Sequence, residues 1–135
     1  MGELGLPEAE RHLALALRYL EEGKTLIEKD PAQASEKLYK AAEEAVKALA
    51  IGLDQEQTRI AAKEGVWWTR LLNRAAEAAA EKLGIEEFAL WWKVAYYLHV
   101  EGFHEARLDR EDVKRNYRYV EALVTTAEKI LKGKA

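Results

Sequence analysis

The segment Phe88-Ala-Leu-Trp-Trp-Lys-Val-Ala-Tyr-Tyr-Leu-His99-Val-Glu-Gly-Phe-His104-Glu105 holds two of the four tryptophans and two of the three histidines of a 135-residue chain. On a helical wheel of about 100° per residue, five of its side chains share one narrow sector. These are Phe88, Trp92, Ala95, His99 and Phe103. The wheel places His104 about 140° away from His99, on nearly the opposite side. An aromatic, largely apolar segment with this spacing predicts a helix packed inside a helical bundle.

Helical periodicity and helix-end signals divide the chain into about five helices. They are expected at residues 7–27, 31–53, 66–83, from 88 to a point between 102 and 108, and 109–133. Residues 54–65 have weak periodicity and are expected to form a loop or frayed turn, and Gly23 is expected to bend or end the first helix. No segment alternates with the period of a strand. We therefore predict an all-α, antiparallel up-and-down bundle, with residues 1–135 forming a single domain.

Specific residues mark the helix boundaries and the core. Asp30 is a good N-cap before Pro31, Asp109 is a good N-cap with Asp112 three residues on, and Gly84 is a natural helix stop. Trp68 is expected on the buried face of the third helix. Val120 is expected on the core stripe of the fifth.

Composition excludes several classes of function. The net charge of −3 gives no overall attraction to nucleic acid or anionic membranes, and the absence of cysteine excludes disulfides and thiol catalysis. Two Asn, three Gln and one Met accompany 33% charged residues, a pattern typical of thermophilic proteins. The chain has no apolar run long enough for a membrane span and does not begin with a signal peptide, so we expect a cytoplasmic protein.

The two histidines of the aromatic segment are five residues apart. Helical metal ligands usually stand three or four apart, so on a regular helix these two would not share an ion, and no metal or cofactor is expected. We expect His99 to be buried and hydrogen-bonded to a neighbouring helix. The alternative is a place in a polar pocket that faces a ligand.

Polar groups gather where the aromatic helix should end. His104, Glu105 and Arg107 could hold a phosphate or move a proton, and with His99 they are the candidate catalytic residues. The alternative is a solvated helix end. A basic sector follows, and it could contact a nucleic-acid backbone or be a solvated face of mixed charge. The candidate ligand-binding residues are Arg107, Arg110, Lys114, Arg115 and Arg118.

Leu90, Val94 and Tyr97 form a second apolar strip outside the core sector of the aromatic helix. Such a strip would be wetted in a monomer, so we expect a homodimer that buries it. Leu15 and Tyr19, on the outer side of the first helix, could belong to the same contact surface.

The segment Ala34-Ser-Glu-Lys-Leu-Tyr-Lys-Ala-Ala-Glu-Glu-Ala-Val-Lys-Ala-Leu-Ala50 resembles the second helix of the HEPN superfamily (higher eukaryotes and prokaryotes nucleotide-binding). Within that superfamily the chain looks most like the archaeal PaREP group. The similarity extends over roughly residues 13–131 through these positions: Trp67-Trp68, Lys82-Leu-Gly84, Trp92, Ala95, Leu98-His99, Gly102-Phe103 and Leu108.

The resemblance implies a compact helical bundle that is usually a homodimer. The superfamily includes RNA-cleaving toxins paired with nucleotidyltransferase antitoxins, so such a partner is an expectation here. Its nuclease signature, an Arg followed four to six residues later by His, is missing from this chain. Arg115-Asn116 imitates its start, but Val120 stands at the His position. The resemblance therefore transfers a region, residues 99–107, and no catalytic residue.

Three hypotheses follow. The first is a homodimeric bundle that binds RNA or a nucleotide, or acts as a toxin–antitoxin-type interaction module, without the usual nuclease centre. The second is a nonstandard, metal-independent RNase that uses His99, His104, Glu105 and Arg107. The third is a purely structural or interaction protein. The missing Arg-to-His spacing favours the non-enzymatic hypotheses.

Overall fold

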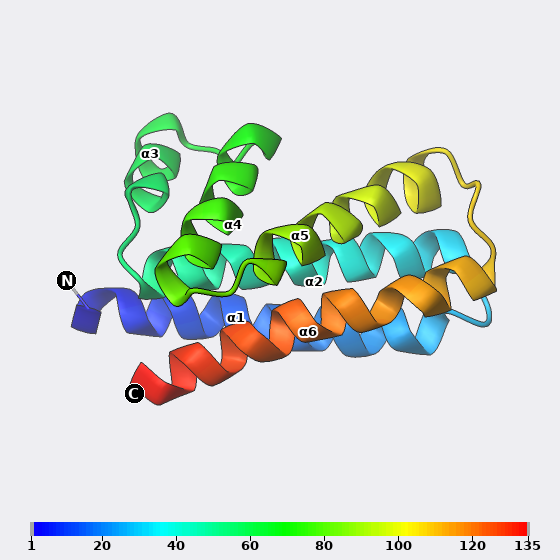
Figure 1. Ribbon diagram of the computed structural model, residues 1–135, viewed down its shortest axis with the longest axis horizontal. Coiled ribbons are helices and arrows are strands. Elements are labelled where there is room, and N and C mark those ends of the chain that lie inside the picture. The colour runs from blue at the N-terminus through cyan, green and yellow to red at the C-terminus, as the bar shows by residue number, and fades with distance from the viewer. Residues whose placement is uncertain (1, 135) are drawn as a thin grey trace.

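The computed structural model describes residues 2–134 as an all-α bundle (Figure 1). Four long segments run alternately up and down: α1 (Gly2–Leu26), α2 (Pro31–Gly52), α5 (Glu87–Tyr97) with its extension η1 (Leu98–His104), and α6 (Arg110–Lys134). The shorter α3 (Glu56–Glu64) and α4 (Thr69–Leu83) lie at one end of the bundle and connect α2 to α5. The all-α prediction is confirmed. The prediction of about five helices is corrected to six α-helices and one π-helix.

Helix ends fall where the capping residues predict them. The Asp30 carboxylate accepts a hydrogen bond from the backbone N–H of Gln33 at 3.1 Å, and Pro31 opens α2. Before α6, Asp109 and Asp112 each accept a hydrogen bond from the other's backbone N–H, at 2.9 and 3.1 Å. The turns that flank α2 and α6 are therefore fixed by local sequence.

Two sequence-based expectations near the α3–α4 connection are wrong. Residues 56–64 form a helix because most of them are good helix formers, although only Ala61 is buried. Gly65 ends that helix in the left-handed conformation, with a φ of 79°. Trp68 precedes the first turn of α4, so its side chain is 42% exposed rather than buried.

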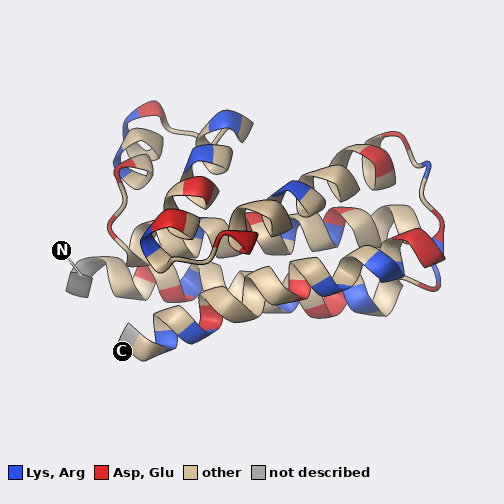
Figure 2. Ribbon diagram, in the orientation of Figure 1, with Lys and Arg blue, Asp and Glu red and all other residues tan. Residues whose placement is uncertain are grey.

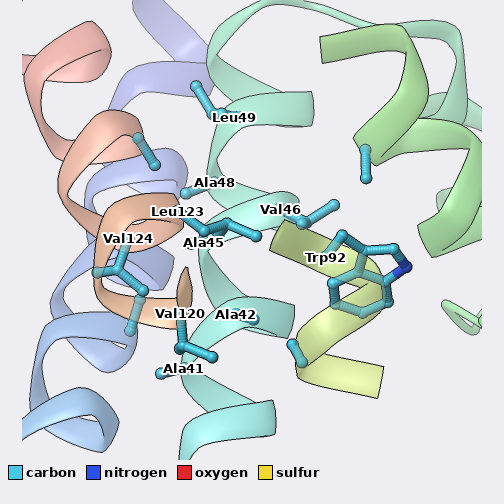
Figure 3. Packing of buried hydrophobic residues seen from close by; sticks show 14 of the residues in the cluster. Ala41, Ala42, Ala45, Val46, Ala48, Leu49, Trp92, Val120, Leu123 and Val124 are labelled. Carbon is cyan, nitrogen blue, oxygen red and sulfur yellow. The ribbon is translucent and has the colours of Figure 1, made fainter. Parts of the chain in front are cut away.

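The core is built around the alanine-rich face of α2, which packs against α1, α6 and η1 (Figure 3). Ala41, Ala42, Ala45 and Ala48 are fully buried, and their small side chains let the neighbouring helices approach closely. Gly23 follows the same logic, because a Cβ at that position would lie 2.7 Å from Leu38 Cδ2. Gly23 therefore does not end α1, which continues to Leu26.

The aromatic helix changes its winding at Leu98. From there to His104 the chain forms a π-helix, and the Glu105 N–H donates to the Val100 carbonyl at 2.8 Å, five residues back. Gly102 faces α2 so closely that a Cβ would collide with Ser35 Oγ. The regular helix expected as far as residues 102–108 thus ends at Tyr97. Within residues 2–134, no helix is both long and apolar enough to cross a membrane.

Candidate functional site

The π-helix places the two histidines of the aromatic segment side by side. His104 Nε2 lies 3.2 Å from His99 Nε2, and the ring centroids are 4.5 Å apart. A π-helix bonds residue i to residue i+5, so side chains five apart come onto one face. The 140° separation expected for a regular helix is therefore wrong for this pair. The two imidazoles lie close enough to act together.

Helix α2 supplies a carboxylate behind the histidine pair. Glu36 Oε1 lies 2.8 Å from His99 Nδ1, and both side chains are about four-fifths buried, with 18% and 20% exposed. With Glu36 ionised and both imidazoles neutral, the His99 Nδ1–H donates to the carboxylate. His99 Nε2 then accepts a hydrogen bond from the Nε2–H of His104. The hydrogen bond predicted for His99 is present, although its side chain is less buried than expected.

Aromatic rings hold the His99 imidazole from several sides. The Tyr39 ring stacks on it with centroids 4.0 Å apart, while Tyr96 and Phe103 lie at 5.7 and 6.5 Å. Burial and the nearby Glu43 and Glu36 raise the pKa of Tyr39, so its phenol keeps its proton at neutral pH. Tyr39 therefore packs against His99 without accepting a proton from it.

Glu105 and Arg107 form a separate group. Arg107 Nη2 donates to Glu105 Oε1 at 3.2 Å, and Nη1 lies 3.6 Å from Glu101 Oε1. The Arg107 side chain is 67% exposed. Of the four candidate catalytic residues, the structure thus brings His99 and His104 together. It pairs Glu105 with Arg107 instead of with an imidazole.

The remaining basic candidates are mixed with acidic groups, as Figure 2 shows for the whole bundle. Lys114 and Arg110 pair with Glu28 at 2.9 and 3.7 Å, and the hydrogen bond to Glu28 raises the pKa of Lys114. Arg118 lies over the Tyr119 ring at 5.0 Å, and Arg115 makes no ion pair with a side chain of residues 5–133. This sector is therefore a weaker anion site than its sequence indicates.

The expected contact residues differ in how much apolar surface they present. Leu90 and Tyr97 on α5 are 55% and 45% exposed, and Val94 between them is half-buried. Leu15 and Tyr19 on α1 are half-buried, and Tyr19 is covered by the cations of Arg18 and Lys37 at 5.3 and 5.2 Å. The backbones of α1 and α5 are not neighbours in the described part of the chain, so the two strips lie on helices that do not pack directly side by side.

Sequence reasoning missed Glu36 and Tyr39. Glu36 lies 63 residues before His99, and nothing in its local sequence links it to the aromatic segment. A cavity of about 330 Å³ between α1 and α6 is lined by Leu13, Leu17 and Leu131 and by none of the candidate residues. Among the side chains of residues 5–133, no group of three or more His, Cys, Asp or Glu is arranged to hold a metal ion.

Comparisons with known proteins match nearly the whole chain. The model of the archaeal PaREP1/PaREP8 family matches residues 11–124. The crystal structure of a protein from Sulfolobus solfataricus is 39% identical, with a TM-score of 0.77, and the match covers 85% of this chain and 94% of that one. A solution structure of Orf c02003 protein, from the same structural-genomics target, is also 39% identical, with a TM-score of 0.74 and coverage of 87% and 91%. No curated protein matches. On the extent of the family match and the 39% identity, this chain is a member of the archaeal PaREP1/PaREP8 family.

Proposed function

We propose that this chain is a homodimeric, HEPN-like bundle that binds a nucleotide or a single-stranded segment of RNA at the surface of α5 and η1. The observation that carries the proposal is a run of neighbouring aromatic and imidazole rings beside Arg107. The ring of buried Trp92 lies next to that of Tyr39, and Tyr39 stacks on His99. His99 in turn neighbours two rings nearer the surface: Tyr96, which is 36% exposed, and exposed His104.

Such a surface suits a ligand that contains both a base and a phosphate. An exposed ring offers a nucleobase a stacking partner worth about 1–3 kcal/mol, with little preference for sequence. The Arg107 guanidinium can bind a phosphate through two hydrogen bonds. The resemblance of residues 34–50 to a helix of the HEPN superfamily supports the same class of ligand.

Charge argues for a small ligand and modest affinity. The chain carries a net charge of −3, and Arg107 is already paired with Glu101 and Glu105. A phosphate must compete with these carboxylates, so binding should be weak and should fall steeply as salt rises. A long duplex needs many unpaired cations, and this face does not offer them.

The homodimer rests on the exposed strip of Leu90, Val94 and Tyr97. Covering this strip with a second copy would stabilise the assembly by roughly 25 cal/mol for each Å² of apolar surface removed from water. Light scattering at micromolar concentration should give twice the chain mass. The variant Leu90→Glu should give the monomer mass, and a monomer from the unaltered chain would contradict the dimer.

A second candidate function is proton transfer to or from a bound RNA, as in a nonstandard RNase. The hydrogen-bonded order Glu36–His99–His104 favours it, because a carboxylate that orients one imidazole is a common support for a general base. Val120 is fully buried at the position where the superfamily signature would have its histidine. We therefore expect RNA cleavage to be absent or very weak.

Fluorescence anisotropy with labelled short oligonucleotides and with a labelled adenine nucleotide tests binding. Tyr96→Ala and Arg107→Ala should each weaken it at least about fivefold, since each removes roughly 1 kcal/mol or more. Arg74→Ala, an exposed arginine on α4, is the matched control and should change nothing. Equal affinity in all three variants would contradict the proposal. Incubation of clean protein with total RNA, alongside His104→Ala, tests cleavage.

A further inference from the structure

We propose that His99 and His104 form a binding site for one first-row transition-metal dication, with Glu36 positioning His99. The proposal is independent of RNA or nucleotide binding. It rests on three features of this corner of the bundle: the distance between two ring nitrogens, the carboxylate behind one of them, and the charges around both.

The distance between the two Nε2 atoms suits a shared ion. They are 3.2 Å apart. Two imidazole nitrogens that each lie about 2.0–2.1 Å from one tetrahedral metal are about 3.3 Å from each other. An ion would thus take the place of the Nε2–H···Nε2 hydrogen bond with almost no movement of either nitrogen, while the proton of His104 moves from Nε2 to Nδ1. Only the π-helical winding of residues 98–104 gives this separation to histidines five residues apart.

Glu36 fixes the tautomer of the His99 imidazole that a metal ligand requires. Its contact with Nδ1 keeps the proton on that nitrogen, which leaves the Nε2 lone pair for the ion. The stacked Tyr39 ring holds the imidazole plane. His99 is therefore set in place before any ion arrives, while exposed His104 leaves the remaining coordination positions open to water or to a ligand.

The surrounding charges favour a cation. Glu36 contacts His99, and Glu101 and Glu105 lie on or next to the π-helix, where they pair with Arg107. Nitrogen ligands select copper, nickel, zinc and cobalt, whereas magnesium and calcium require oxygen ligands. With two protein ligands, the affinity should follow the order Co²⁺ < Ni²⁺ < Cu²⁺.

Calorimetric titration of tag-free, metal-stripped protein with Ni²⁺, Co²⁺ and Mg²⁺ tests the site without any nucleotide. We expect one Ni²⁺ per chain, weaker Co²⁺ binding and no Mg²⁺ binding. His104→Ala should abolish the Ni²⁺ signal. Glu36→Gln, which keeps both ligands, should weaken it about 10- to 100-fold.

His12 provides the matched control because it is the third histidine of the chain and pairs with Glu44 elsewhere on α2. The His12→Ala variant should bind Ni²⁺ as the unaltered chain does. Circular dichroism of each variant separates loss of binding from loss of fold. No Ni²⁺ binding by the unaltered chain, or binding that survives His104→Ala, would overturn the proposal.

Discussion

The bundle contains two pairs of the same chemistry, His12–Glu44 and His99–Glu36, and each joins α2 to a neighbouring helix. In both pairs the imidazole Nδ1 contacts the carboxylate, at 2.6 and 2.8 Å, and about four-fifths of each side chain is buried. They differ in what lies beyond. Glu44 also contacts Lys47, whereas the far nitrogen of His99 contacts His104. The His12–Glu44 pair therefore ends at a lysine, whereas the His99–Glu36 pair continues to the exposed side chain of His104.

The cause of this difference is the winding of the backbone. α1 is a regular helix, and no second histidine accompanies His12 on it. η1 is a π-helix packed on α2 through Gly102, and this winding brings His104 to His99. A histidine–carboxylate pair therefore only connects two helices when the helix that carries the histidine is regular. It becomes part of a larger polar site when π-helical winding brings a second histidine beside it.

The largest expected effect comes from adding a methyl group at the helix contact. Gly102→Ala would drive its Cβ into Ser35, and overpacking of this kind costs about 3 kcal/mol of unfolding free energy. Urea unfolding monitored by circular dichroism measures that cost. Metal binding should fall as well, since the two imidazoles would be displaced from one another.

Ser35→Gly makes room for the added methyl and serves as the control. It costs about 1 kcal/mol by itself because glycine is a poor helix former. In the double variant, the cost of Gly102→Ala should shrink by more than half. Simple addition of the two single effects would show that close packing against Ser35 does not determine the shape of η1.

Removing each buried histidine compares the two pairs directly. His99→Ala should lower the unfolding free energy by about 2 kcal/mol, because Glu36 loses a charged hydrogen bond and forms no ion pair with a Lys or Arg among residues 5–133. His12→Ala should cost less, because Glu44 keeps Lys47. Chemical unfolding of both variants measures the order. A larger loss for His12→Ala would contradict this account of the pairs.

Acid should weaken the His12–Glu44 pair. Burial raises the pKa of Glu44, but the hydrogen bond from His12 and the charge of Lys47 outweigh it and hold the pKa below its ordinary 4.5. A lowered folded-state pKa stabilises the fold above the unfolded value, and that stability is lost as pH falls through the folded value. The unfolding free energy should therefore decline below about pH 4.5. Glu44→Gln should make the decline shallower.

The smallest expected effect on stability belongs to His104→Ala. This side chain is exposed, so its removal should change the unfolding free energy by no more than about 0.5 kcal/mol. The same variant should lose Ni²⁺ binding altogether. A change of several kcal/mol would mean that the histidine pair serves the fold and not a ligand.

The sequence predicts the bundle better than the site. Asp30, Gly84 and Asp109 predict helix ends because capping is local chemistry, and Val120 lies in the core as its spacing predicts. The helix at 56–64 was missed because a short helix at the edge buries little and leaves a weak pattern.

The histidine pair could not be predicted for a different reason. A helical wheel assumes one winding throughout, and the change after Tyr97 depends on how Gly102 packs against Ser35 of another helix. The same tertiary contact brings Glu36 to His99 across 63 residues of chain. The resemblance to the HEPN superfamily points to the region of residues 99–107 but not to its geometry.

Nuclear magnetic resonance of the imidazole nitrogens tests the contact between His99 and His104 most directly. In protein labelled with ¹⁵N, the account predicts scalar coupling across the hydrogen bond between the two Nε2 atoms. His104→Ala should shift the Nε2 resonance of His99 and leave both nitrogens of His12 unchanged. The contact would be contradicted if the coupling were missing and the Nε2 resonance of His99 were unchanged in His104→Ala.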